Sequence, residues 1–261
     1  MHRIVIIAQN TFRETVRDKV LYNLLVFVFL LIAASLLIAE LSLNQEQLII
    51  ARMGLTVMLF FGVLIAIFIG TGLVYKEIDK RTIYAMLAKP VRRSEFILGK
   101  FFGLTTTLLV NCSVMMVAIL SALAYLNYTR YGLAMIPWVV LSAGYMIFLE
   151  LLVIVAFALS FSSFTTPALS VMFSVILYLI GSLSQDLLLF ANTVPSAILK
   201  YIALALYYIL PNLSNFNYIT KVSHGETVPA MNILAATAYA ALYITLLLVA
   251  TMMIFQKRNF K

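Results

Sequence analysis

The hydrophobic pattern of the chain alternates long apolar runs with short polar or charged connections. Six of these runs have about 20 residues or more, the length that a helix needs to cross the hydrocarbon core of a membrane. We therefore predict an all-α integral membrane protein, organised as a single domain over residues 1–261, with six transmembrane helices. Their expected ranges are 20–41, 53–75, 101–126, 138–161, 167–190 and 231–255.

A shorter apolar run lies within residues 191–230, between the last two predicted spans. It covers about 198–210, lies between Pro195 and Pro211, and includes Lys200. A run of this length is too short to cross the membrane comfortably, and proline suits a helix start and stops a helix end. We predict a short re-entrant or interfacial helix on the outer face. The alternative is a spanning helix, which would place the basic C-terminus outside.

The first 19 residues have the periodicity of an amphipathic helix. Its apolar and small side chains share one face: Ile4, Ala8, Phe12, Thr15 and Val16. The arginines point elsewhere, and the pattern runs into the first span without a turn signal. We predict a helix that lies in the membrane interface before the first span. The alternative is a solvated basic N-terminus that only fixes the topology.

Composition supports a membrane protein, and the charge pattern orients it. The chain is 64% hydrophobic and 11% charged, whereas soluble domains have about 45–50% apolar and about 25% charged residues. With both termini in the cytoplasm, 14 of the 18 Lys and Arg residues face inward, and the other four are Arg52, Arg130, Lys200 and Lys221. This asymmetry follows the positive-inside rule. We predict a multi-pass protein of the cytoplasmic membrane with both termini inside, whose net charge reflects topology rather than nucleic-acid binding.

Residues for covalent or metal chemistry are scarce. Cys112 is the only cysteine, and the two histidines, His2 and His224, are far apart in the chain. The Gly-Lys pair in ILGKFFG lacks the upstream glycine and the following Ser or Thr of a phosphate-binding loop. We therefore expect no catalytic residue, no metal site and no cofactor in this chain.

The connection between the second and third spans, residues 76–100, contains seven basic and three acidic residues. Residues 76–88 contain no Gly or Pro and predict a helix that continues from the second span. Pro90 is expected to end this helix. Ser94 is the expected N-cap of the next helix, with Glu95 in its first turn.

This insert also keeps an apolar edge formed by Ile83, Met86 and Leu87. A loop that only joined two spans could have about four residues. Apolar anchors beside charges of both signs favour docking to a protein partner. The alternative is a basic hairpin that anionic lipids hold at the membrane surface.

The insert and its flanks, GTGLVYKEIDKRTIYAMLAKPVRRSEFILGKFFG, resemble the signature region of ABC type-2 permeases. The matching residues are Glu77, Arg81, Thr82, Leu87, Pro90, Arg93, Gly99 and Lys100. The order of interfacial helix, six spans and short outer helix is also similar to that family. The ILPNLSNF segment at 209–216 is similar to the branch that includes permeases of copper-enzyme maturation and gliding motility.

The resemblance implies a division of labour between subunits. A separate cytoplasmic ABC ATPase subunit, acting as a dimer, would bind ATP and Mg²⁺ and grip the insert as a coupling helix. The expected docking residues are Glu77, Arg81, Thr82, Ile83, Met86, Leu87, Pro90 and Arg93. A second permease copy, identical or a sister chain, would complete the pathway in the lipid membrane.

Some residues inside the predicted spans have candidate roles of their own. Glu150 lies midway along the fourth span, where an ionisable residue is costly and is a functional candidate by default. A hydrogen-bonded carboxyl that locks helix packing is the alternative. The small residues of the second span, spaced by four, favour close helix packing: Gly62, Ala66 and Gly70. Three residues of the outer segment are candidates for an exit gate: Tyr207, Tyr208 and Asn212.

These observations favour the permease subunit of an ABC exporter with an unknown substrate. The first alternative is a non-transporting mechanical or assembly subunit of an envelope machine, driven by the same ATPase. The second is a proton-coupled secondary transporter that uses Glu150. The lack of a visible internal repeat and the structured insert make this alternative the weakest.

Overall fold

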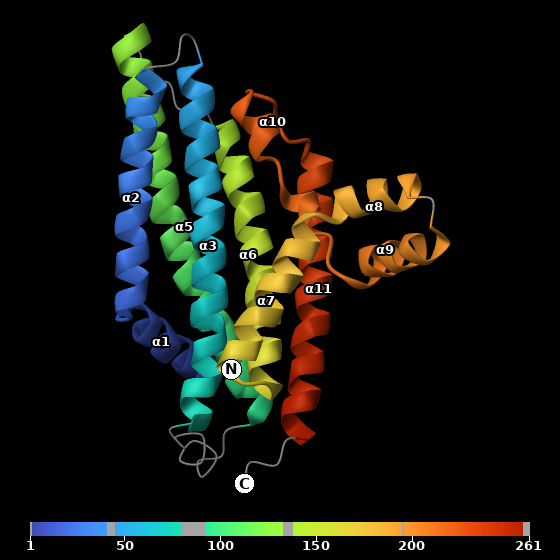
Figure 1. Ribbon diagram of the computed structural model, residues 1–261. Helices are drawn as coiled ribbons and strands as arrows, with labels where there is room; N and C mark the ends of the chain where they lie inside the picture. Colours follow the sequence, from blue (N-terminus) through green and yellow to red (C-terminus); the bar gives the residue numbers. More distant parts are fainter. Residues whose placement is uncertain (1, 41–44, 80–91, 133–137, 195, 258–261) are drawn as a thin grey trace.

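The computed structural model describes residues 2–40, 45–79, 92–132, 138–194 and 196–257, which form helices and their connections without a strand. The predicted all-α membrane fold is confirmed. In chain order the elements are α1 (His2–Val16), α2 (Lys19–Glu40), α3 (Glu46–Asp79), α5 (Arg93–Tyr131), α6 (Val139–Phe164), α7 (Pro167–Ser182), α8 (Ser184–Thr193), α9 (Ala197–Ile209), the 3₁₀ turn η1 (Leu213–Phe216), α10 (Ile219–Ser223) and α11 (Ala230–Lys257) (Figure 1).

Four helices of the described residues are long and apolar enough to cross a membrane: α3, α5, α6 and α11. Helix α2 has 22 residues, with a described apolar part at Leu24–Ile38, and it runs beside α3 and α5 (Figure 1). The second and third predicted spans are parts of longer helices, because α3 has 34 residues and α5 has 39. The added turns extend both helices into the insert, α3 as far as Asp79 and α5 from Arg93 onward.

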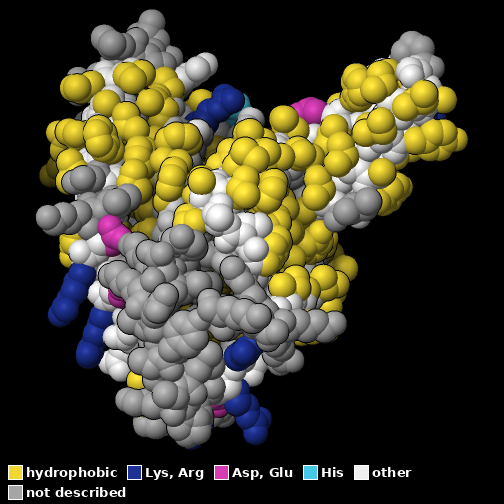
Figure 2. All heavy atoms as spheres, turned by 60° about the horizontal axis from the view of Figure 1, so that its bottom comes forward, with side chains coloured by type: hydrophobic (Ala, Val, Ile, Leu, Met, Phe, Trp, Pro, Cys, Tyr) yellow, Lys and Arg dark blue, Asp and Glu magenta, His cyan; other side chains and the backbone are white. Residues whose placement is uncertain are grey.

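One end of the bundle, which we call the foot, holds α1, the end of α3, the start of α5 and the end of α11 (Figure 1). Helix α1 lies across the foot, at a steep angle to α2. Figure 2 shows Lys and Arg side chains mainly around the foot, whereas apolar side chains cover most of the rest of the visible face. The bundle therefore has a basic end and an apolar body, as expected of a membrane protein.

The residues of the expected fifth span, 167–190, form two helices with a bend between them. Helices α7 and α8 meet at an angle of 61° around Leu183. The Ser184 hydroxyl donates a hydrogen bond to the Gly181 carbonyl at 2.5 Å, and such Gly/Ser pairs are typical sites of helix kinks. The η1 segment fills the space beside Gly181, where an added Cβ would lie 2.9 Å from the Leu213 side chain.

A helix is present where the short outer helix was expected, and the 13 residues of α9 are too few to cross a bilayer core. Helices α8 and α9 pair with each other and extend away from the side of the bundle (Figure 1). We call this helix pair the arm. Its surface is largely apolar, since Ile198, Tyr201 and Tyr208 are all more than 70% exposed.

The bundle is built around the contact between α3 and α6, which we call the α3–α6 seam. An added Cβ at Gly62 would lie 2.5 Å from Leu151 Cδ1, and one at Gly70 would lie 2.9 Å from Ala158 Cβ. Ala66, between the two glycines, is fully buried. The three small residues of α3 therefore lie where its backbone approaches α6 closely.

Polar side chains tie α6 to its neighbours near the foot. Ser162 Oγ donates to the Thr71 carbonyl of α3 at 2.7 Å. Ser160 Oγ and Thr251 Oγ1, on α11, share a hydrogen bond at 2.6 Å. All these side chains are buried, so α3, α6 and α11 are fixed to one another by hydrogen bonds as well as by apolar packing.

Candidate functional site at the foot of the bundle

Helix α5 begins within the insert, at Arg93, and its first turn is capped by the side chain of Glu95. The N-cap is Arg92, whose backbone N–H donates to Glu95 Oε2 at 2.9 Å. The expectation of Ser94 as the N-cap is therefore wrong, since Ser94 lies inside the first turn. Glu95 stands in the first turn, as expected, and its charge suits the positive end of the helix.

The same turn of α5 holds the end of α11. Arg93 Nη1 donates a hydrogen bond to the Phe255 carbonyl at 2.9 Å, and the rings of Phe96 and Phe255 stack with centroids 6.0 Å apart. Phe255 lies in the last turn of α11, where backbone carbonyls have no partner within the helix. A cation at this position also stabilises the negative end of the helix.

The next turn of α5 holds α1. An added Cβ at Gly99 would lie 2.6 Å from Ile7 Cβ, and one at Gly103 would lie 2.6 Å from Thr11 Cβ. Lys100, between the glycines, is 1% exposed, and its Nζ lies 3.5 Å from Glu14 Oε2. We call these six residues, Ile7, Thr11, Glu14, Gly99, Lys100 and Gly103, the α1–α5 clasp.

Glu150 lies deep inside the bundle, far from the foot. Its side chain is 3% exposed, and its Oε2 atom has no hydrogen-bond partner among the described residues. Tyr178 of α7 lies within electrostatic range.

The three gate candidates of the outer segment differ in their surroundings. The backbone N–H of Asn212 donates to Tyr239 Oη at 2.9 Å, and the Ser214 hydroxyl donates to Asn212 Oδ1. The Tyr207 and Tyr208 rings meet edge to face with centroids 5.2 Å apart. Asn212 is thereby fixed at the junction of η1 and α11, whereas Tyr208 is 78% exposed on the arm.

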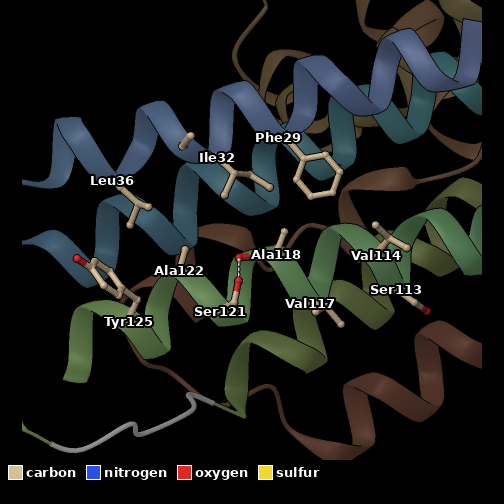
Figure 3. A pocket seen from close by; sticks show the side chains of 11 residues that line it. Phe29, Ile32, Leu36, Ser113, Val114, Val117, Ala118, Ser121, Ala122 and Tyr125 are labelled. Atoms are coloured by element: carbon tan, nitrogen blue, oxygen red, sulfur yellow. Dashed lines mark hydrogen bonds between the residues drawn. The ribbon is translucent and has the colours of Figure 1, made fainter. Parts of the chain in front are cut away.

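An apolar groove of about 690 Å³ separates α2 from α5 above the clasp (Figure 3). Phe29 and Ile32 of α2 face Val114, Val117 and Ala118 of α5 across it. The serine hydroxyls on its α5 wall donate to carbonyls of their own helix, at 2.7 Å for Ser113 and 2.8 Å for Ser121. The groove therefore offers apolar surface and few free polar groups.

Comparison with known families identifies this architecture. Residues 5–260 match the family described as ABC-2 family transporter protein. The chain belongs to the ABC-2 transporter family. No curated protein matches the chain, and the similarity to the copper-enzyme-maturation and gliding-motility branch stays a prediction.

Membership of this family makes the chain an ABC transporter permease, a transmembrane subunit rather than the ATPase itself. Most of the docking residues expected for the ABC-2 insert lie outside the described residues: Arg81, Thr82, Ile83, Met86, Leu87 and Pro90. Glu77 belongs to the end of α3, and its side chain is not described. Arg93 is described, and its guanidinium contacts α11 of the same chain.

Reasoning from the sequence missed the α1–α5 clasp. Gly99 and Gly103 form a Gly-x-x-x-Gly pair within ILGKFFG, a pattern that permits close helix approach. Gly99 was predicted as part of the permease signature, and close packing of the glycine pair against another helix was not predicted. Glu14 of α1 pairs with the buried Lys100, and no local pattern in the sequence indicates a contact between residues 86 positions apart.

Proposed function

We propose that this permease is the membrane subunit of an ABC exporter, driven by a separate ABC ATPase that docks on the insert at residues 76–100. ATP and Mg²⁺ would bind to that partner, which acts as a dimer. A second permease copy, identical or a sister chain, would complete the pathway. The basic foot would face the cytoplasm, with both termini on that side, in accord with the positive-inside rule.

The observation that carries this proposal is the construction of α5. It starts at Arg93, inside the insert, and continues for 39 residues along the bundle. Its first three turns contact both the start of the chain, through Gly99 and Lys100, and the end of α11, through Arg93. A movement of the insert would therefore be passed through α5 to α1 at the start of the chain and to α11 at its end.

The docking step can be tested by purifying the tagged permease from membranes of its native host. We expect an ATP-binding subunit to co-purify with the unaltered chain. Replacing Leu87 by Asp and Pro90 by Ala removes an apolar anchor and the proline break, and should abolish co-purification. Losing the apolar anchor should lower partner recovery at least about tenfold, which corresponds to about 1.4 kcal/mol.

The matched control carries the same kinds of change in the connection between α5 and α6, with Leu133→Asp and Pro137→Ala. This connection follows the other end of α5, so we expect it to retain the ATPase. Equal recovery of the ATPase with the insert variant and the control would contradict docking on the insert.

The unpartnered Oε2 of Glu150 keeps a proton-coupled secondary transporter as a second candidate. A pH gradient would then drive substrate flux without ATP, and Glu150→Gln would abolish that flux. Flux that needs ATP and persists in Glu150→Gln would rule this candidate out.

A further inference from the structure

The α1–α5 clasp has the geometry of a fixed joint rather than a loose contact. At Gly99, the space for a Cβ is occupied by Ile7 Cβ and Cγ2, both at 2.6 Å. At Gly103, it is occupied by Thr11 Cβ at 2.6 Å and by the Ala8 carbonyl at 2.8 Å. Any larger residue at either glycine would force the two helix backbones apart.

The charge pair of the clasp fixes the register of the two helices. Lys100 is almost fully buried, and its Nζ lies 3.5 Å from Glu14 Oε2 and 5.8 Å from the centre of the Phe96 ring. A buried ammonium group needs an anionic or hydrogen-bonding partner. Sliding α1 along α5 by one turn would separate this pair, so the pair favours a single register.

Helix α1 is joined directly to α2. It ends at Val16, and α2 begins at Lys19. Backbone hydrogen bonds bridge the connection, from Asp18 N–H to the Thr15 carbonyl at 3.0 Å and from Leu21 N–H to the Asp18 carbonyl at 3.2 Å. A displacement of α1 therefore moves the lower end of α2.

Above the foot, α2 and α5 are separated by the apolar groove (Figure 3). Small residues line part of it, including Ala33, Ala118 and Ala122, so the two helices do not interlock there. The pair is thus joined through α1 at the foot, whereas along the groove α2 packs mainly on α3 and makes fewer direct contacts with α5.

We infer that Gly99 and Lys100 are positioning residues that couple the start of α5 to α1, so that movement of the insert changes the spacing of α2 and α5 across this groove. The source of the movement, an ATPase docked on the insert, rests on the proposed function. The clasp itself belongs to the permease alone, and it can be tested without the partner.

The first test measures the α2–α5 spacing in the purified permease. Spin labels are placed at Phe29→Cys and Val117→Cys, on opposite walls of the groove, in a Cys112→Ala background that removes the only native cysteine. We expect Gly99→Ala to displace α1 and shift the distance distribution. Adding Ile7→Gly removes the two nearest atoms that the new Cβ would meet and leaves only the Ile4 carbonyl oxygen at 3.3 Å, so the double variant should return towards the original distribution.

Two controls separate this effect from general misfolding. Labels at Phe60→Cys on α3 and Leu141→Cys on α6 should keep their distance in the Gly99→Ala variant, because the α3–α6 seam does not involve the clasp. If Gly99→Ala does not fold, Lys100→Gln with Glu14→Gln removes both charges without adding volume. It should broaden the Phe29–Val117 distribution, because the register is no longer fixed. An unchanged Phe29–Val117 distribution in the folded clasp variants would overturn the inference.

The second test uses the complex with the co-purified ATPase. A non-hydrolysable ATP analogue should shift the Phe29–Val117 distance in the unaltered chain, and the shift should be lost in Gly99→Ala although the ATPase still binds. No shift in the unaltered complex, or an equal shift in both chains, would overturn the coupling role. If no ATPase co-purifies, the proposed function is refuted instead. The distance measurement on the permease alone would still show whether the α1–α5 clasp controls the spacing of α2 and α5.

Discussion

The α3–α6 seam and the α2–α5 groove both contain small residues spaced by four, yet only the seam is closely packed. In the seam, Gly62 and Gly70 of α3 meet Leu151 and Ala158 of α6 with no room for a Cβ. In the groove, Ala118 and Ala122 of α5 line an open space of about 690 Å³. Small residues permit close approach, but the opposite helix decides whether it happens.

The α1–α5 clasp extends this comparison. There the small pair Gly99 and Gly103 is again filled by side chains of the opposite helix, Ile7 and Thr11. A short crosswise helix therefore packs on α5 more closely than the long neighbouring α2 does along the groove. Close contact between α1 and α5 at the foot, with open space between α2 and α5 above it, is the arrangement needed to pass a movement of α5 on to α2.

The largest expected loss of stability comes from a substitution that forces α3 and α6 apart at the seam. Gly70→Leu would place a Cβ 2.9 Å from Ala158 Cβ, which cannot rotate away, so the helices must separate. We expect a loss of about 1–3 kcal/mol of stability, measured as a lower melting temperature in detergent.

The matched control for this change is Ala118→Leu in the groove, where space is available and the expected effect is within about 0.5 kcal/mol. If both substitutions lowered the stability equally, the seam could not be more closely packed than the groove. Gly62→Ala should be milder than Gly70→Leu, because the atom it meets, Leu151 Cδ1, is the end of a flexible side chain.

A smaller effect is expected for Thr251→Val, which removes the hydrogen bond between α11 and Ser160 of α6. Such bonds contribute on average about 0.6 kcal/mol in membrane proteins, and at most about 1.7 kcal/mol. Thr245→Val is the control on the same helix, because its hydroxyl bonds only the Ala241 carbonyl one turn earlier. Equal melting temperatures for the two variants would show that the bond between helices adds nothing.

The smallest effect is expected for Ser121→Ala in the groove. Its hydroxyl is exposed and donates to the Ala118 carbonyl of its own helix, so no contact between helices is lost. The free energy of unfolding, followed through the melting temperature in detergent, should change by no more than about 0.5 kcal/mol. A larger loss would mean that Ser121 contacts α2 and that the groove is closed in solution.

The sequence predicted most of the helices because their apolar runs are long and uninterrupted. It placed the fourth and sixth spans at 138–161 and 231–255, close to α6 and α11. It predicted helix beyond both spans on the side of the insert, but it missed the turns of α3 before residue 53 and of α5 after residue 126, where charged and polar residues weaken the hydropathy signal. The docking residues of the insert stay a prediction, because most of them lie outside the described residues.

The kink at Leu183 could not be read from hydropathy, since apolar residues continue on both sides of it. The Gly-Ser-Leu-Ser segment was a local signal, but it becomes decisive only because η1 packs against Gly181. The N-cap was misplaced for a similar reason. Ser94 has the stronger intrinsic preference, whereas the backbone at Arg92 is the group that Glu95 binds.

By itself, the sequence determined the membrane fold, the approximate spans, the basic end of the molecule and the permease resemblance. Each depends on composition or on the order of residues along a single segment. Only the tertiary structure decided which small residues are closely packed, how Lys100 is paired and where the fifth span bends. These depend on the opposing surface, as when Ile7 fills the space at Gly99, and such pairings join residues far apart in the chain.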